Sequence, residues 1–241
     1  MMYRNLIYIP VPIPIPLYKP LKRLQRKLRL LKVPNILGDR DVEYSFAIRH
    51  LPQSGDRALD FGSGDTYVPL ILARFFNEVV ALDREKTQFF WSHPKVKEVQ
   101  ADILEDDLPY TEYFDVITNI SSVEHVGLAG RYGTIKNTPD GDLIAMKKLY
   151  NWLKKGGIHL LTVPVGRDAV YMPLCRVYGE NRLPLLLEGY KVVHEEYWAK
   201  PGKDNKWYPV EKAYALNYET SVRSWSPAYN IYALGCFVLQ K

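Results

Sequence analysis

The stretch Leu59-Asp60-Phe61-Gly62-Ser63-Gly64-Asp65 decides the fold of this chain. The residues that lead into it, 57–61, are largely apolar, which is typical of a short buried strand, and glycines follow at positions 62 and 64. Glycine lets the backbone turn tightly and approach a ligand, and a helix that begins just beyond offers free amide groups to that ligand. The stretch therefore predicts a strand, a ligand-binding turn and a helix.

Strand-like and helix-like segments alternate on both sides of this turn. We expect strands at 57–61, 78–82, 96–100, 114–120 and 158–165, and helices at 41–51, 67–76, 84–91 and 142–153, the last closed by Lys154-Lys155-Gly156-Gly157. Residues 190–198 and 229–239 read as strands without a full helix between them, which predicts an antiparallel pair at one edge. The pattern predicts an α/β, Rossmann-like fold with a seven-stranded, mostly parallel sheet and helices on both faces.

The first 34 residues differ from the rest of the 241-residue chain. Prolines at every second position of 10–16 favour an extended strip, and residues 18–32 predict a basic helix with leucines on one face. Such a helix could bind a membrane surface, or its leucines could pack on this protein's own body, a second copy or a protein partner. We therefore divide the chain into an extension, 1–34, and a domain, 35–241.

The distribution of charge and cysteine narrows the class of protein. Residues 1–32 contain eight cations and no acid, which leaves a net charge of −3 on the remainder of a chain whose total is +5. The cations are confined to one segment, so a nucleic-acid enzyme is not favoured. Cys175 and Cys236 have no metal-type spacing and form no disulfide framework, which fits an expected cytoplasmic location.

The glycine turn alone does not identify its ligand, because dinucleotide enzymes share it. Tyr67 stands where their third glycine would fall. Asp83 ends the second expected strand, where an acid can accept both hydroxyls of a ribose, and Asp102 with Ile103 follows the third, where an acid and an apolar neighbour can hold an adenine. Together with the antiparallel edge pair, these features favour S-adenosylmethionine (SAM) over a dinucleotide.

Residues 57–165 thus resemble the core of class I SAM-dependent methyltransferases. The resemblance implies a site in which the Asp60 turn lines the methionine part, Asp83 the ribose, and Asp102 and Ile103 the adenine. The predicted cofactor-binding residues are Asp60, Gly62, Ser63, Gly64, Asp83, Asp102, Ile103 and Asn119.

The segment after the fourth strand, Asn119-Ile120-Ser121-Ser122-Val123-Glu124-His125-Val126-Gly127, lies at the edge where open α/β sheets bind their ligands. His125 is the candidate general base, since histidine titrates near neutrality, and Glu124 could orient it or bind a metal ion. The segment is similar to the E-x-x-E-H-V stretch of quinone-biosynthesis O-methyltransferases, which is associated with a divalent metal. Ser121 replaces the first acid here, which weakens the case for a metal. Asp140 and Asp142 could complete a Mg²⁺ site, although Asp140 also suits a helix N-cap.

A second resemblance covers about residues 55–200 and is to a largely uncharacterised methyltransferase-like family associated with cell-surface glycan biosynthesis. It rests on the stretches 121–133, 140–146, 163–168 and 176–179. It implies methylation of a sugar hydroxyl on a glycan or lipid-linked saccharide. Arg131, the third candidate catalytic residue, could grip a phosphate or uronate with Arg167, and Tyr132 and Tyr171 could stack on the sugar.

Two other functions remain open from the sequence. One is methylation of a small phenolic or quinone-like lipid, and the other is a SAM-fold interaction module without turnover. We expect a cytoplasmic protein, peripheral at the membrane face if residues 1–34 bind there, and an oligomer is compatible with the sequence.

Overall fold

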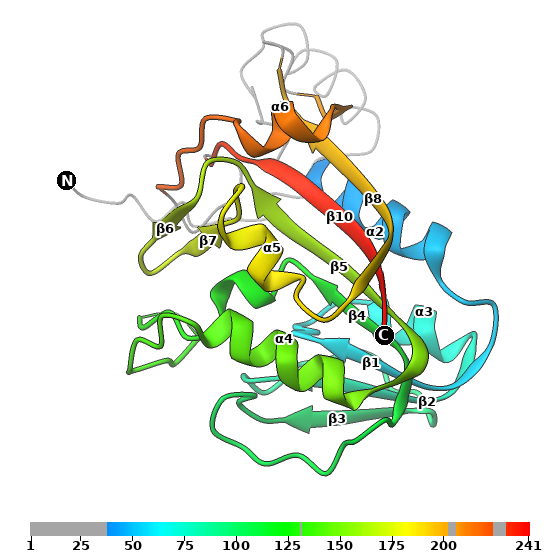
Figure 1. Ribbon diagram of the computed structural model, residues 1–241. Helices are drawn as coiled ribbons and strands as arrows, with labels where there is room; N and C mark the ends of the chain where they lie inside the picture. Colours follow the sequence, from blue (N-terminus) through cyan, green and yellow to red (C-terminus); the bar gives the residue numbers. More distant parts are fainter. Residues whose placement is uncertain (1–37, 131, 202–205, 224–229) are drawn as a thin grey trace, which may run out of the picture. The chain divides into compact units, whose positions relative to one another are not determined.

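The computed structural model describes residues 38–130, 132–201, 206–223 and 230–241, all within one compact unit, Asn35–Lys241 (Figure 1). The predicted proline strip and basic helix of residues 1–34 lie outside the described residues and stay predictions. Within the described part of the chain, no helix is long and apolar enough to cross a membrane.

An eight-stranded sheet forms the centre of the domain, in the order β3-β2-β1-β4-β5-β10-β8-β9. The first five strands of this order are mutually parallel, β10 is antiparallel to both β5 and β8, and β9 is antiparallel to β8. Their bounds are β1 Gly55–Phe61, β2 Phe76–Asp83, β3 Val96–Gln100, β4 Phe114–Ile120, β5 Leu153–Val165, β8 Lys191–Ala199, β9 Tyr208–Pro209 and β10 Ala233–Gln240. A separate hairpin pairs β6 (Ala169–Tyr171) with β7 (Cys175–Val177).

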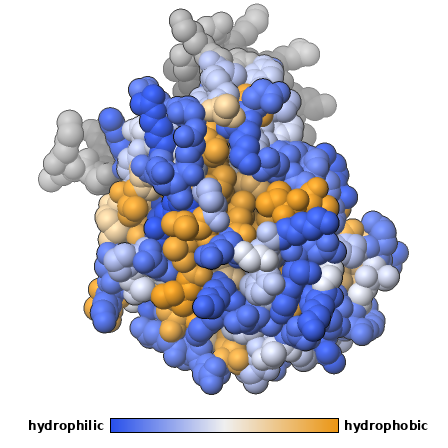
Figure 2. Space-filling model, in the orientation of Figure 1, coloured by the Kyte–Doolittle hydropathy of each residue, from blue (hydrophilic) through white to orange (hydrophobic). Residues whose placement is uncertain are grey.

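Helices cover both faces of the sheet, as the sequence predicts (Figure 1). One face packs on α2 (Gly38–His50) and α3 (Val68–Ala73) through a core that includes Phe46 and Leu72. The other packs on α4 (Gly141–Trp152), α5 (Arg182–Leu186) and α6 (Lys212–Leu216). On the outside of α4 and α5, apolar surface is broken into patches by polar side chains (Figure 2). The buried clusters on the two faces stabilise the sheet and so fix the relative positions of its strand ends.

The expected fold class is confirmed, with three differences. The sheet has an eighth strand, β9, which has only two residues and lies beyond the expected antiparallel edge pair of β10 and β8. No helix forms at 84–91, where Phe90 is 97% exposed and the chain has no buried face to pack. The Lys154–Gly157 segment does not follow α4 as a loop but opens β5 directly, with Gly156 at a φ of 74°.

The carboxyl ends of the parallel strands meet at one edge of the sheet. Phe61 is paired with Leu82, Asp83 with Gln100, and Ile120 with Thr162. The loops that leave these strands therefore face a common space, and a short 3₁₀ helix, η1 (Val123–His125), follows β4 into it.

Candidate active site

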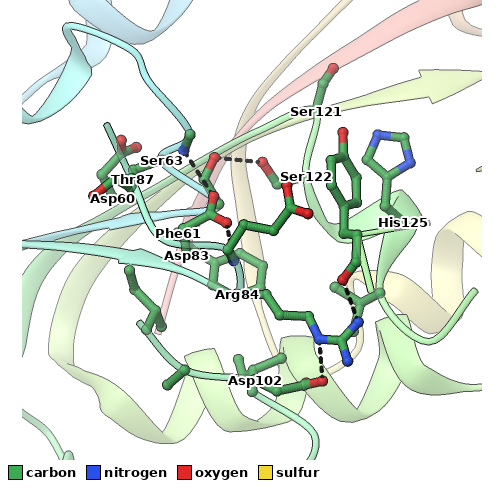
Figure 3. A pocket seen from close by; sticks show the side chains of 18 of the residues that line it. Asp60, Phe61, Ser63, Asp83, Arg84, Thr87, Asp102, Ser121, Ser122 and His125 are labelled. Carbon is green, nitrogen blue, oxygen red and sulfur yellow. Dashed lines mark hydrogen bonds and ion pairs between the residues drawn. The ribbon is translucent and has the colours of Figure 1, made fainter. Parts of the chain in front are cut away.

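A cavity of about 510 Å³ opens at this edge (Figure 3). It is lined by the turn after β1, the ends of β2 and β3, the segment after β4 and the first half of α2. Eight predicted site residues line it: Asp60, Gly62, Ser63, Gly64, Asp83, Asp102, Ile103 and His125. The sheet thus brings together residues that are up to 65 positions apart in the sequence.

Asp60 and Ser63 line the cavity, and each has a buried side-chain oxygen. Asp60 Oδ1 accepts a hydrogen bond from Thr118 Oγ1 at 2.7 Å, whereas Asp60 Oδ2 and Ser63 Oγ have no hydrogen-bond partner. Burial raises the pKa of Asp60 to about 7; the Thr118 hydrogen bond opposes this shift and the charge of Asp83 adds to it. A buried polar atom without a partner is costly, so these two atoms suit a polar ligand such as the methionine end of SAM.

The turn itself is fastened to the end of β2. Gly64 N donates to Asp83 Oδ2 at 2.8 Å, and Glu85 N donates to Asp83 Oδ1 at 2.9 Å. Gly62 and Gly64 have φ values of 71° and 48°, in the left-handed region that glycine adopts without strain. Each carboxylate oxygen of Asp83 can accept a further hydrogen bond, which suits a pair of ribose hydroxyls.

Arg84 is a functional candidate that sequence reasoning missed. Its Nε pairs with Asp102 Oδ2 at 2.8 Å, while Nη1 donates to the carbonyl oxygen of Tyr132 at 2.6 Å and to the hydroxyl of Thr134 (Figure 3). One guanidinium therefore joins the expected adenine acid to the loop on the other side of the cavity. Its position directly after Asp83, at the end of β2, was the available signal.

A buried ionic group from α2 reaches the end of β4. Glu43 is fully buried and accepts hydrogen bonds from the hydroxyls of Ser121 and Thr162, the latter at 2.9 Å. Arg40 lines the cavity and pairs with Glu43 at 2.5 Å, and that carboxylate raises the pKa of Arg40 above its ordinary value. Ser121 has a φ of 45°, a conformation that non-glycine residues rarely adopt. Ser121 stands where the E-x-x-E-H-V pattern has its first acid. The carboxylate that lies beside this position is that of Glu43, from α2.

His125 lies on the cavity wall in η1. Its Nδ1 lies 2.7 Å from the carbonyl oxygen of Leu174, which can only accept, so Nδ1 carries the proton. The other ring nitrogen, Nε2, is then the one without a proton, and it lies 3.5 Å from Glu124 Oε1. Glu124 is buried and does not line the cavity, so its place is behind the histidine. The ring of Tyr132 meets that of His125 edge-on at 5.6 Å.

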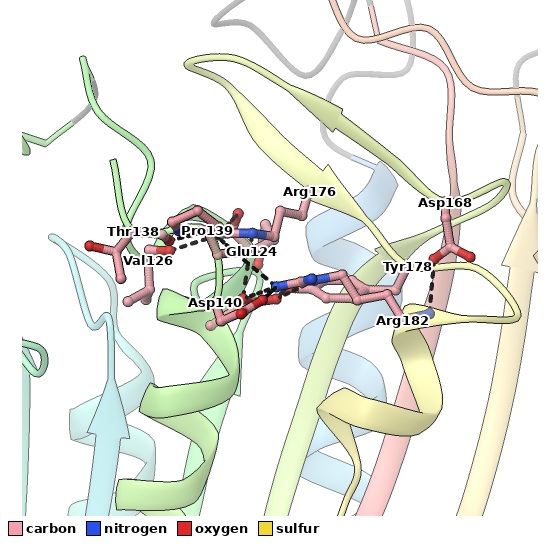
Figure 4. A network of polar contacts seen from close by, with 10 residues as sticks. Glu124, Val126, Thr138, Pro139, Asp140, Asp168, Arg176, Tyr178 and Arg182 are labelled. Carbon is pink, nitrogen blue, oxygen red and sulfur yellow. Dashed lines mark hydrogen bonds and ion pairs between the residues drawn. The ribbon is translucent and has the colours of Figure 1, made fainter. Parts of the chain in front are cut away.

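Arg176 fixes the turn that carries His125 (Figure 4). This fully buried side chain donates to the carbonyl oxygens of Val126, Thr138 and Pro139 at 2.7, 3.1 and 3.0 Å, and more weakly to that of Glu124 at 3.4 Å. Its Nε lies 3.4 Å from Asp142 Oδ1. The β7 strand therefore holds the segment after β4 through one guanidinium.

Two residues that the sequence analysis assigned to the site are fully buried and do not line the cavity. Asn119 is fully buried, accepts from Val123 N and faces Met146, so it lies in the core beneath the cavity. Asp142 is also fully buried and is neutralised by Arg182 at 2.5 Å and by Arg176, which occupy the space that a Mg²⁺ site would need.

Asp140 precedes α4 but makes no capping hydrogen bond; it pairs with Arg182. Of the expected acceptor residues, Tyr132 lines the cavity, whereas Arg167 and Tyr171 do not, and Arg131 lies outside the described residues.

About half of the chain matches a family of proteins without a known function. Residues 87–204 match the family described as "Caenorhabditis protein of unknown function, DUF268". Comparison with the curated proteins finds no match.

Among solved structures, the chain is similar to the 1,6-didemethyltoxoflavin N1-methyltransferase of Burkholderia thailandensis, crystallised with S-adenosylhomocysteine (TM-score 0.55, 15% identity, 97% of this chain and 93% of that one). It is also similar to the N-methyltransferase NodS of Bradyrhizobium japonicum with the same ligand (0.52, 16%, 91% and 97%) and to the cyclase SpnF (0.55, 18%, 84% and 81%). The chain therefore has the fold of the class I SAM-dependent methyltransferases.

Proposed function

We propose that this chain is a SAM-dependent methyltransferase. The observation that carries the proposal is the pair of buried atoms without partners, Asp60 Oδ2 and Ser63 Oγ, in the cavity that Asp83 and Asp102 also line. Asp60 and Ser63 would hold the methionine end, Asp83 the ribose, and Ile103 the adenine face. Asp102 already pairs with Arg84, so an adenine amino group would share that carboxylate.

We further propose that the acceptor is a hydroxyl group, on a sugar of a glycan or lipid-linked saccharide. When bound, SAM supplies a methyl group that an acceptor atom displaces from sulfur. In this proposal His125, which lines the cavity, takes the acceptor's proton, and the hydrogen bond of Nδ1 to Leu174 orients the ring. Tyr132 offers an aromatic surface beside it. Two fold relatives are N-methyltransferases by name and a third is a cyclase, so the acceptor has to be measured.

Two measurements test the proposal in order. Titration calorimetry should show binding of SAM and none of NAD; the reverse result would overturn the cofactor assignment. Transfer of a labelled methyl group from SAM into glycan, lipid and RNA fractions then identifies the acceptor class. If the label is in the lipid fraction, the saccharide is released by mild acid: label that leaves with the saccharide supports the proposal, and label that stays with the lipid favours the phenolic alternative.

Variants separate the catalytic base from the cofactor site. His125→Ala and Arg131→Ala should lose turnover while still binding SAM. His93→Ala, a histidine outside the cavity, is the matched control. Wild-type rates in both variants would discard the assignment, and SAM binding without transfer in the wild type would favour the interaction module.

We also keep the proposal that residues 1–34 bring the enzyme to a membrane surface. It rests on the leucine and cation pattern of the sequence. Co-sedimentation with anionic vesicles, with and without residues 1–34, tests it: equal sedimentation of the two chains would remove the membrane role.

A further inference from the structure

Two histidines and a glutamate meet at the far end of α2 from the cavity. His50 is the last residue of α2, and His194 and Glu196 lie two positions apart on β8, so their side chains share one face of that strand. One ligand atom of each residue lies within 4.8 Å of the other two. Arg40 and Tyr44, which line the cavity, are six to ten residues away along the helix, so the group is separate from the cofactor site.

The geometry points to a binding site for a divalent transition metal ion, formed by His50, His194 and Glu196. Two imidazoles and a carboxylate are the ligands of zinc sites that keep a fourth position for water, and nitrogen ligands disfavour Mg²⁺ and Ca²⁺. Zn²⁺ is the best match.

The distances suit such an ion. Ligands at about 2.0–2.1 Å from a tetrahedral ion lie roughly 3.4 Å apart. Here His194 Nε2 is 3.0 Å and His50 Nε2 is 3.9 Å from Glu196 Oε1, values on either side of that separation. Small rotations about side-chain bonds would bring the three atoms around one ion.

The second observation is that His50 Nε2 is buried and has no hydrogen-bond partner among the residues that the structure describes. It faces Glu196 across a distance too long for a hydrogen bond, and its ring lies tilted against those of Phe46 and His194, with 4.7 Å between ring centroids in each pair. Buried nitrogens normally have a partner, and a metal ion would supply one.

Arg49 is the competing cation. Its Nη2 lies 3.1 and 3.0 Å from the two oxygens of Glu196, whose Oε2 also accepts from Trp198 Nε1 at 3.2 Å. The Arg49 side chain is half exposed, so it can swing into solvent when an ion takes its place. Bound metal would join α2 to β8, and through α2 it would steady the helix that places Arg40 and Glu43 at the cavity.

The test is titration of the full, tag-free and chelator-treated chain with Zn²⁺ alone at pH 7.5. We expect one equivalent to bind, Mg²⁺ not to bind, and His50→Ala and His194→Ala each to weaken Zn²⁺ binding at least tenfold. His93→Ala should leave it unchanged. Arg49→Gln should tighten it, because the competing guanidinium is gone.

A second readout guards against misfolded variants. Zn²⁺ should raise the thermal midpoint of the wild type, and the half-exposed His194→Ala chain, with an unchanged circular dichroism spectrum, should lose that rise. A wild type that binds no Zn²⁺, or histidine variants that bind it as tightly as the wild type, would overturn the site. Because SAM is absent from these titrations, their outcome is independent of the proposed methyl transfer.

Discussion

Asp60 shows how burial prepares a single side chain for a ligand. It ends β1 with one carboxylate oxygen bonded to Thr118 and the other without a partner, and its pKa is about 7 in the folded chain against 3.8 for an ordinary aspartate. The folded state therefore holds the proton more tightly than the unfolded state. Stability from this group is complete at pH below about 3.8 and is lost as pH rises through 7.

The ammonium group of SAM should bind the ionised form of Asp60. The affinity for SAM should then fall about tenfold between the plateau above pH 8 and pH 6. With a pKa of about 7, only about one tenth of the Asp60 carboxyl groups are ionised at pH 6. Calorimetric titration of SAM across pH 6–8.5 measures this. Asp60→Asn should bind weakly with little pH dependence; a variant that keeps the wild-type slope would show that another group titrates.

Single residues also show which parts of the site could be predicted from the sequence. The Asp60 turn and Asp83 could be predicted because glycines and strand ends mark their positions. Asn119 is fully buried and does not line the cavity, which the sequence could not reveal because a polar residue in β4 can face either the cavity or the core. Glu43 could not be predicted, because it reaches Ser121 from a helix 78 residues earlier and only tertiary packing brings them together.

Between elements, single arginines connect loops that the sheet alone leaves independent. Arg84 joins the loop after β2 to the segment that follows η1, and Arg176 joins β7 to η1 and to the start of α4.

The helix that the sequence predicts at 84–91 does not form, and the reason is the lack of a buried face. This segment carries aromatic residues but no face that the core can bury, and only its first four residues, 84–87, line the cavity.

Arg84→Met should loosen the loop that Arg84 holds. Amides at 132–134 should exchange with solvent about tenfold faster, because charged hydrogen bonds of about 1.5–3 kcal/mol are lost. Hydrogen exchange read by mass spectrometry measures this. Arg74→Met, an exposed arginine at the end of α3, is the matched control, and equal protection in the two variants would contradict the role.

Arg176→Met should cost about 3–5 kcal/mol of unfolding free energy, because it leaves buried carbonyl oxygens and part of the Asp142 charge without a partner. Denaturant unfolding gives this value. Arg57→Gln, which breaks a surface pair with Glu78 and a contact with the ring of Tyr113, should cost no more than about 1 kcal/mol. If Arg176→Met also lowered the unfolding free energy by no more than about 1 kcal/mol, the buried guanidinium would not be needed for stability, and the prediction would be contradicted.

At the scale of the whole molecule, the fold could be predicted because alternating strands and helices leave few arrangements. The insertion of β10 between β5 and β8 could not, since both neighbours of an antiparallel strand look alike in sequence. The location of the cavity followed from the fold, whereas the contribution of α2 to its wall did not.

Ligand binding should be visible in the stability of the whole domain. SAM at about 100 times its dissociation constant adds about 2.7 kcal/mol to the folded state. For a domain of this size, that raises the thermal midpoint by about 5–10 °C. Differential scanning calorimetry with SAM, S-adenosylhomocysteine and NAD measures it, and a rise with NAD alone would refute the cofactor.

The position of β10 has a consequence for the order of synthesis. The ribosome makes β8 before β10, yet β10 lies between β5 and β8, with seven of its eight residues buried. Until Ala233–Gln240 has emerged, β5 presents an uncovered edge and β8 can pair only with the two-residue strand β9. Nascent chains paused before this segment should need chaperone protection, although the strands that form the cavity are already made.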